Sequence, residues 1–133
     1  MQALQQLLVA LLLAVNAYAA EPPTVYQLVD QYGPAFGVAT SSLNSTIWCE
    51  SRVDIRAYNA SDPFGGAKGV SQFLSPTFEH YAPLAGISKP DIWNPEHQII
   101  TMAYMFSKNE AKQWTAWRNL QKCGQCVCNE KAP

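Results

Sequence analysis

One residue in the sequence is a strong candidate for acid–base chemistry. Glu50 lies near the end of a predicted helix, on or beside an apolar stripe that includes Leu43 and Ile47. Trp48 and Cys49 precede it directly, so we expect its carboxyl group to be partly removed from water. Desolvation disfavours the charged form of a carboxyl group and raises its pKa. Such a group stays protonated closer to neutral pH, and it can then donate a proton to a poor leaving group.

A second carboxylate is the usual partner of such an acid in enzymes that hydrolyse glycosidic bonds. Asp54 follows Glu50 by four residues and would lie nearby if the helix continued, and Asp62 lies in a segment without helical periodicity. No motif surrounds either residue, and we expect each to be a turn or cap residue. A single acid is therefore the expectation.

Short motifs surround Glu50 and follow it along the chain. In order they are Trp48-Cys49-Glu50-Ser51-Arg52, Ala57-Tyr58-Asn59, Gly69-Val70-Ser71-Gln72-Phe73 and Trp93-Asn94-Pro95-Glu96-His97-Gln98-Ile99, with Ala103-Tyr104 one turn later. Over about residues 40–120 this order and spacing resembles the soluble lytic transglycosylase family, which has a lysozyme-like fold. In that family a Glu-Ser pair ends a helix, and its Glu is the sole catalytic acid/base.

The resemblance implies a role for several residues of this chain. Glu50 would be the catalytic acid/base, and the substrate-binding residues would be Ser51, Tyr58, Gln72, Phe73 and Tyr104. Other roles are open for most of them. Ser51 could simply bond to the backbone at its helix end, Gln72 could tie down its own loop, and Phe73 and Tyr104 could be core aromatics.

The resemblance also implies the reaction. Members of the family cleave the β-1,4 bond between N-acetylmuramic acid and N-acetylglucosamine in bacterial peptidoglycan and leave a 1,6-anhydro ring. They use no metal and no organic cofactor. Two alternatives remain open: a hydrolytic muramidase that uses Asp54 or Asp62 as well, and a glycan-binding domain without catalysis.

One region departs from the family. Many members carry an Ala-Tyr-Asn segment near the C-terminal end that faces the active site. Residues 114–119 here are Trp-Thr-Ala-Trp-Arg-Asn, so no match exists and substrate contacts from that side are in doubt.

The N-terminus is typical of an export signal. Leu7 to Val15 is an unbroken apolar run, too short to span a bilayer, which needs about 20 residues. Ala17-Tyr18-Ala19 has the small residues of a signal-peptidase site, although no Lys or Arg precedes the run. We predict a signal peptide over residues 1–19, a secreted or periplasmic protein, and no membrane span after cleavage.

Export makes disulfides the default state of the four cysteines, Cys49, Cys123, Cys126 and Cys128. Four cysteines allow three pairings, and a zinc site is a rival interpretation that their spacing does not favour. A Cys-Glu-Ser motif with a late cysteine resembles compact secreted relatives, including the resuscitation-promoting factors. That resemblance implies a bond between Cys49 and Cys123. A bond between Cys126 and Cys128 would be strained by their spacing.

The other elements predict one domain over residues 20–133, with a core over about 24–122 and a cysteine-rich tail over 123–133. We expect helices over 24–31 and about 41–52, and further helices from Ser75-Pro76 and from Asn94-Pro95 to about Asn109. A final helical turn should begin at Trp114. Residues 56–72 predict a loop with a small hairpin. The fold class is thus α+β, mainly helical, a lysozyme-like fold with a small β/loop insertion.

Composition limits the partners. The 133 residues carry a formal net charge of −1 and no basic cluster, which argues against nucleic-acid binding. We expect peptidoglycan glycan strands as the partner and a monomeric protein.

Overall fold

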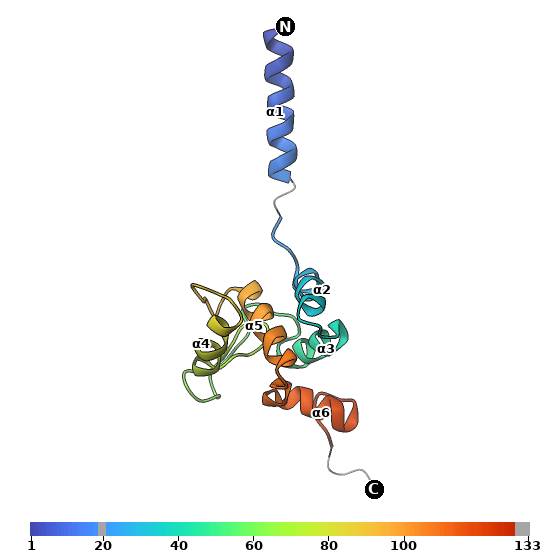
Figure 1. The fold of residues 1–133 in the computed structure, drawn as a ribbon, viewed down its shortest axis with the longest axis vertical. Coiled ribbons are helices and arrows are strands. Elements are labelled where there is room, and N and C mark those ends of the chain that lie inside the picture. The colour runs from blue at the N-terminus through green and yellow to red at the C-terminus, as the bar shows by residue number, and fades with distance from the viewer. Residues whose placement is uncertain (19–20, 130–133) are drawn as a thin grey trace.

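The computed structural model describes the backbone of residues 1–18 and 21–129. Helix α1 (Gln2–Tyr18) extends away from the rest of the molecule, and α2 (Val25–Ala35), α3 (Thr40–Ser51), α4 (Ser75–Leu84), α5 (Pro95–Ser107) and α6 (Thr115–Cys123) form its body (Figure 1). A two-stranded antiparallel sheet, β1 (Tyr58–Asn59) and β2 (Ala67–Lys68), follows α3. A short 3-10 helix, η1 (Ala111–Gln113), precedes α6. The prediction of a mainly helical α+β chain with a small hairpin is confirmed.

Local capping explains where the helices begin. The Thr24 hydroxyl accepts a hydrogen bond from the Gln27 backbone N–H, and the Gln27 side chain accepts one from the Thr24 N–H, so the two residues form a capping box. The Asn94 side chain likewise accepts bonds from the N–H groups of Glu96 and His97, ahead of Pro95 in the first turn of α5. Both predicted helix starts are confirmed.

One predicted helix end is wrong. Helix α2 does not end at residue 31 but runs on to Ala35, past Gly33-Pro34. Pro34 lies in the last turn, where Phe36 N–H bonds to the carbonyls of Tyr32 and Gly33 and closes the helix around it. Helix α4 begins at Ser75 as predicted, with Leu74 at the cap position, and the Ser75 hydroxyl accepts a hydrogen bond from Lys68 Nζ at 2.9 Å.

The core is built around α5. This helix packs against α2 and α4, while α3 packs against α2 and α6. Fully buried side chains of α5, including Ile99, Met102 and Met105, meet Leu43 and Ile47 of α3 in one apolar cluster. The helix that carries Glu50 is thereby fixed to the centre of the domain.

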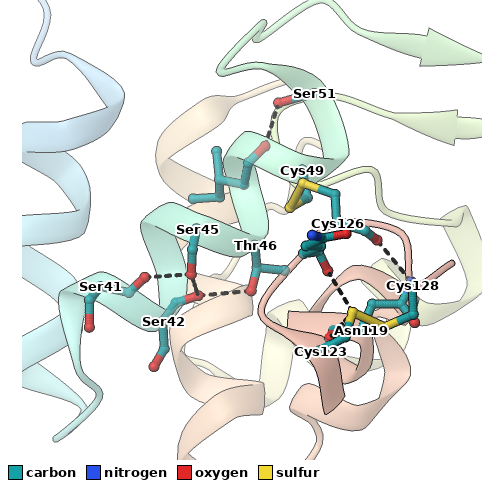
Figure 2. Close-up of a disulfide and its surroundings, with 12 residues drawn as sticks. Ser41, Ser42, Ser45, Thr46, Cys49, Ser51, Asn119, Cys123, Cys126 and Cys128 are labelled. Atoms are coloured by element: carbon teal, nitrogen blue, oxygen red, sulfur yellow. Dashed lines mark hydrogen bonds between the residues drawn. A yellow bond between two sulfur atoms is a disulfide. The ribbon is translucent and has the colours of Figure 1, made fainter. Parts of the chain in front are cut away.

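The disulfides correct the predicted pairing. Cys49 bonds to Cys126, and Cys123 bonds to Cys128, so the predicted bond between Cys49 and Cys123 is wrong (Figure 2). Helix α6 runs as far as Cys123, and Gly124 then adopts the left-handed conformation (φ 71°), which reverses the chain. Cys126 thus returns toward α3 and Cys128 toward the helix end. All four cysteines are oxidised, which also rules out the zinc interpretation in this structure.

The N-terminal helix was predicted to be a signal peptide with a cleavage site at Ala17-Tyr18-Ala19. Ala19 lies outside the described residues, as does the end of the tail from residue 130. No helix in the described parts of the chain combines the length and the apolar character required to cross a bilayer.

Gly69 gives a test of the packing between the β2 loop and α5. Its φ is +76°, and a Cβ at this position would overlap the buried side-chain amide of Gln98. Gly37 has a similar φ of +69° but open space around it. We expect Gly37→Ala to cost about 1 kcal/mol of unfolding free energy, from backbone strain alone. Gly69→Ala should cost about 3 kcal/mol, because the Gln98 hydrogen bonds are lost as well.

Chemical denaturation of both variants with the disulfides intact measures the difference. Equal losses of stability would contradict the close packing of Gln98 against the loop.

Candidate active site

Glu50 lies in the last turn of α3, at the wall of a cleft of ≈ 390 Å³. Arg52 ends the helix in the left-handed conformation (φ 54°), and Val53 continues with φ 65°, so the chain turns sharply away after Ser51. Leu43 and Ile47, one and two turns earlier on α3, are buried in the core. The backbone at Glu50 is therefore fixed to the core, and the residue itself is half-buried.

Burial raises the pKa of Glu50 to about 7. Loss of solvation is the largest cause, since an ionised carboxylate is less well stabilised away from water. A backbone hydrogen bond from Ala116 lowers the pKa, and the negative charge of Asp62 raises it again. Near neutral pH the group therefore exists in both forms, which is the condition for a side chain that donates a proton and then takes one back.

The start of α6 contributes the bond that opposes the shift. Ala116 is the second residue of this helix, where backbone N–H groups have no partner inside the helix. The N-terminus of a helix also carries partial positive charge. Both features stabilise the carboxylate form of Glu50, the form that exists after proton donation.

The loop between β2 and α4 also lines the cleft. Side chains from α3, from α5 and from the residue before α6 make hydrogen bonds to its backbone. Ser51 Oγ donates to the Val70 carbonyl oxygen at 2.6 Å, and Trp114 Nε1 donates to the Ser71 carbonyl oxygen at 2.8 Å. Gln98 Oε1 accepts from the Ser71 N–H at 2.8 Å, and its Nε2 donates to the Lys68 carbonyl oxygen at 2.8 Å. These bonds, two of them buried and two partly buried, fix the loop backbone relative to Glu50.

Gln72 lines the cleft from this loop. Its Nε2 donates to the carbonyl oxygens of Ala57 at 3.1 Å and of Gly69 at 3.0 Å, so its amide nitrogen ties down its own loop. No hydrogen bond to its Oε1 occurs within the described residues. The orientation fixed by Nε2 thus leaves an acceptor available for an N–H or O–H group in the cleft.

Phe73 also lines the cleft but is a core residue at the same time. It is 2% exposed and packs edge-on against Phe78 and Trp114, with ring centroids 5.4 and 5.3 Å away. Phe73 therefore adds a small apolar surface to the cleft lining.

The other predicted site residues lie elsewhere. The residues that line the cleft in the described chain do not include Ser51, Tyr58 or Tyr104. Ser51 joins α3 to the loop through Val70, as described above. The Tyr58 hydroxyl donates to the Gly65 carbonyl oxygen at 3.0 Å, beside Trp93.

Tyr104 belongs to the α2–α5 packing. Its ring packs edge-on against Phe36 at 6.2 Å, and the Lys108 ammonium lies 5.7 Å from the ring centroid. The predicted roles of Ser51, Tyr58 and Tyr104 at a substrate stay predictions.

Several residues that line the cleft were not predicted as site residues from the sequence. Gln113, Trp114 and Thr115, from the region without the family's Ala-Tyr-Asn segment, line the cleft beside Glu50. Only the buried tryptophan had a sequence signal, since a large aromatic residue at a helix start suggests packing. Asp62, considered only as the partner of a hydrolase, lines the same cleft.

Asp54, the other carboxylate considered, is exposed and accepts a hydrogen bond from the Arg56 N–H at 2.9 Å, as a turn residue does. Within the described residues no group of three or more His, Cys, Asp or Glu side chains is arranged to hold a metal ion.

No protein-family profile, curated protein or solved structure matches this chain. The function is therefore inferred from the chemistry of the cleft and from the sequence motifs that surround it.

The pKa of Glu50 can be measured by carbon-detected NMR titration of its carboxyl group. We expect a midpoint near 7. Asp62→Asn should lower this pKa, because it removes a nearby negative charge. Asp54→Asn, which removes an exposed carboxylate outside the cleft lining, should leave it unchanged.

The same pKa has a consequence for stability. A raised folded-state pKa means that the native protein binds a proton that the unfolded chain has already lost. The free energy of unfolding should therefore fall as the pH rises from about 4.5 to about 7, and Glu50→Gln should remove this fall. A Glu50 midpoint at the ordinary value would contradict the desolvated site.

Proposed function

We propose that this protein is a peptidoglycan lytic transglycosylase with a lysozyme-like fold and that Glu50 is its single catalytic acid/base. The observation that carries the proposal is the half-buried carboxyl group of Glu50, with a pKa raised to about 7, in a cleft of ≈ 390 Å³. The motif order around Glu50 and the helix–hairpin–helix arrangement that follows it support the same proposal.

In the first step, protonated Glu50 donates its proton to the glycosidic oxygen that leaves C1 of N-acetylmuramic acid, and the C1–O bond breaks. The resulting carboxylate is stabilised by the Ala116 N–H at the start of α6. In the second step, this carboxylate accepts the proton of the sugar's own 6-hydroxyl group, and O6 forms the new bond to C1. The products are a 1,6-anhydro sugar and a free hydroxyl end, Glu50 is protonated again, and no water is consumed.

The remaining cleft residues orient the sugar in this proposal. Gln72 Oε1 is placed to accept a hydrogen bond, as from an acetamido N–H, because Nε2 already bonds to two backbone carbonyls. Gln113 and Thr115 add polar groups from the η1–α6 side. Phe73 and Met105 provide the apolar surface that excludes water from the breaking bond.

Hydrolysis on the same scaffold is the second candidate. The observation in its favour is Asp62, which lines the cleft and whose charge raises the pKa of Glu50. In a hydrolase this carboxylate would stabilise the positive charge at C1 or activate water. The Asn59 side-chain amide donates to Asp62 Oδ2 at 3.1 Å, which orients the Asp62 carboxylate. A glycan-binding domain without catalysis is the third candidate, and it gives no role to the proton affinity of Glu50.

We also propose that the protein is exported, to the periplasm or the exterior, with residues 1–19 removed. The two disulfides fit an oxidising compartment, and the apolar run of α1 with its small-residue site fits a signal peptide. The intact mass of the exported protein tests this, with an N-terminus at Ala20 expected and an uncleaved chain as the contradicting result.

Product analysis separates the three functions. The purified protein with its disulfides formed, Glu50→Gln and Asp62→Asn are incubated with peptidoglycan, and the released fragments are identified by mass spectrometry. We expect anhydro-muropeptides from the parent and a rate at least about 100-fold lower from Glu50→Gln, the usual contribution of a general acid. Asp62→Asn should still give anhydro products.

Reducing-end products that disappear in Asp62→Asn would move the protein to the hydrolases. No product from the folded parent would favour the binding domain.

A further inference from the structure

A second groove lies on the other side of α3. Glu50 faces the cleft, while Trp48 and Cys49, on the preceding part of the same helical turn, line this groove of ≈ 620 Å³. Its walls come from α2, α3 and the C-terminal end of α6. The lining residues that bear on recognition are Tyr26, Asn44, Ser45, Trp48, Leu120 and Gln125. The proposed reaction uses none of them.

The Cys49–Cys126 disulfide forms part of this groove. Figure 2 shows Ser45 and Cys49 on α3, with the segment after α6 held next to them through Cys126. Asn119 Nδ2 donates to the Cys126 carbonyl oxygen at 2.8 Å and fixes this segment to α6 as well. The groove is therefore a preformed feature of the cross-linked fold.

Two aromatic rings are presented in the groove. Tyr26 of α2 and Trp48 of α3 are each 50% exposed, although both belong to residue types that usually bury most of their surface. The Arg52 guanidinium lies 4.9 Å from the centroid of the Trp48 ring, within cation–π distance. Exposed, oriented aromatic rings with polar neighbours are typical of a binding surface.

The polar groups that line the groove are uncharged. Hydroxyl and amide side chains such as Ser45, Asn44 and Gln125 lie beside the rings, and the described lining contains no Asp, Glu, Lys, Arg or His. Asn44 lies on the α3 side of the groove, and its Oδ1 is buried below the surface. A neutral ligand with apolar faces and many hydrogen-bonding groups matches this lining, and saccharides have this chemistry.

We propose that this groove is a second saccharide-binding site, which takes β-1,4-linked N-acetylhexosamine chains by stacking on Tyr26 and Trp48. The choice of sugar rests on the proposed function, because a protein that cleaves this polymer is surrounded by it and meets it on this face as well. The site binds a glycan strand on the face of α3 away from the cleft, without taking part in cleavage.

NMR titration of the Glu50→Gln protein with tri-N-acetylchitotriose tests the proposal, because this variant is expected not to cut the probe. We expect saturable shifts of the Trp48 indole N–H and of the Ser45 and Gln125 amides. Trp48→Ala and Tyr26→Ala should each weaken binding at the groove about tenfold, the equivalent of one aromatic contact. Phe64→Ala, which removes an exposed aromatic outside both sites, should leave it unchanged.

The outcomes are distinct. Shifts confined to cleft residues such as Gln72 and Thr115 would overturn the second site and leave the proposed function standing. Shifts at the groove in a protein whose parent releases no muropeptide would support the second site and count against catalysis. Broadening of groove signals that depends on protein concentration, without sugar, would assign the groove to a second copy of the chain. No shift at millimolar sugar in a folded protein would also overturn the proposal.

Discussion

The carboxyl group of Glu50 stays partly out of water because the segments that surround it are fixed. The most important of these segments is the loop between β2 and α4, which is anchored by side chains from three other elements. Ser51, Gln98 and Trp114 hold the backbone of residues 68–71 from α3, α5 and the start of α6. Buried polar groups are costly unless they are paired, so each of these bonds is strongly favoured once the apolar core has formed. The same bonds position the backbone beside Gln72, which lines the same cleft as Glu50.

Helix α6 links the cleft to the disulfides. Its first turn provides the Ala116 backbone hydrogen bond to Glu50, and the segment after its last turn is bonded to Cys49, the residue before Glu50. A bond that closes a loop of this length adds about 4 kcal/mol of stability on chain-entropy grounds, a large share for a domain of this size. Both ends of α6 therefore act on α3: the segment after its last turn is cross-linked to Cys49, and its first turn lowers the pKa of Glu50, against the larger effect of burial.

Sequence patterns predicted the features that depend on residues close together in the chain, such as most helix starts and ends. The starts of α2 and α5 follow from Thr24 and Asn94, and the observed range of α3, Thr40–Ser51, agrees with the helix predicted over about 41–52. The cysteine pairing was wrong because it depends on where Gly124 turns the chain, a choice that the spacing alone leaves open. Asp62, Ala116 and Thr115 reach the cleft only through tertiary packing, and an alanine backbone N–H has no sequence signature. Gln98 was visible as part of a motif, but its role as a buried clamp required the structure.

A crystal structure of the Glu50→Gln protein with a bound, uncut peptidoglycan glycan fragment tests the central claim most directly. If Glu50 is the proton donor, the strand crosses the cleft with one β-1,4 glycosidic oxygen within about 3.2 Å of the side chain at position 50. The 6-hydroxyl of the adjoining N-acetylmuramic acid should lie on the same side. A strand that occupies the cleft with its glycosidic oxygens out of reach of position 50, or one that binds only away from the cleft, would contradict it.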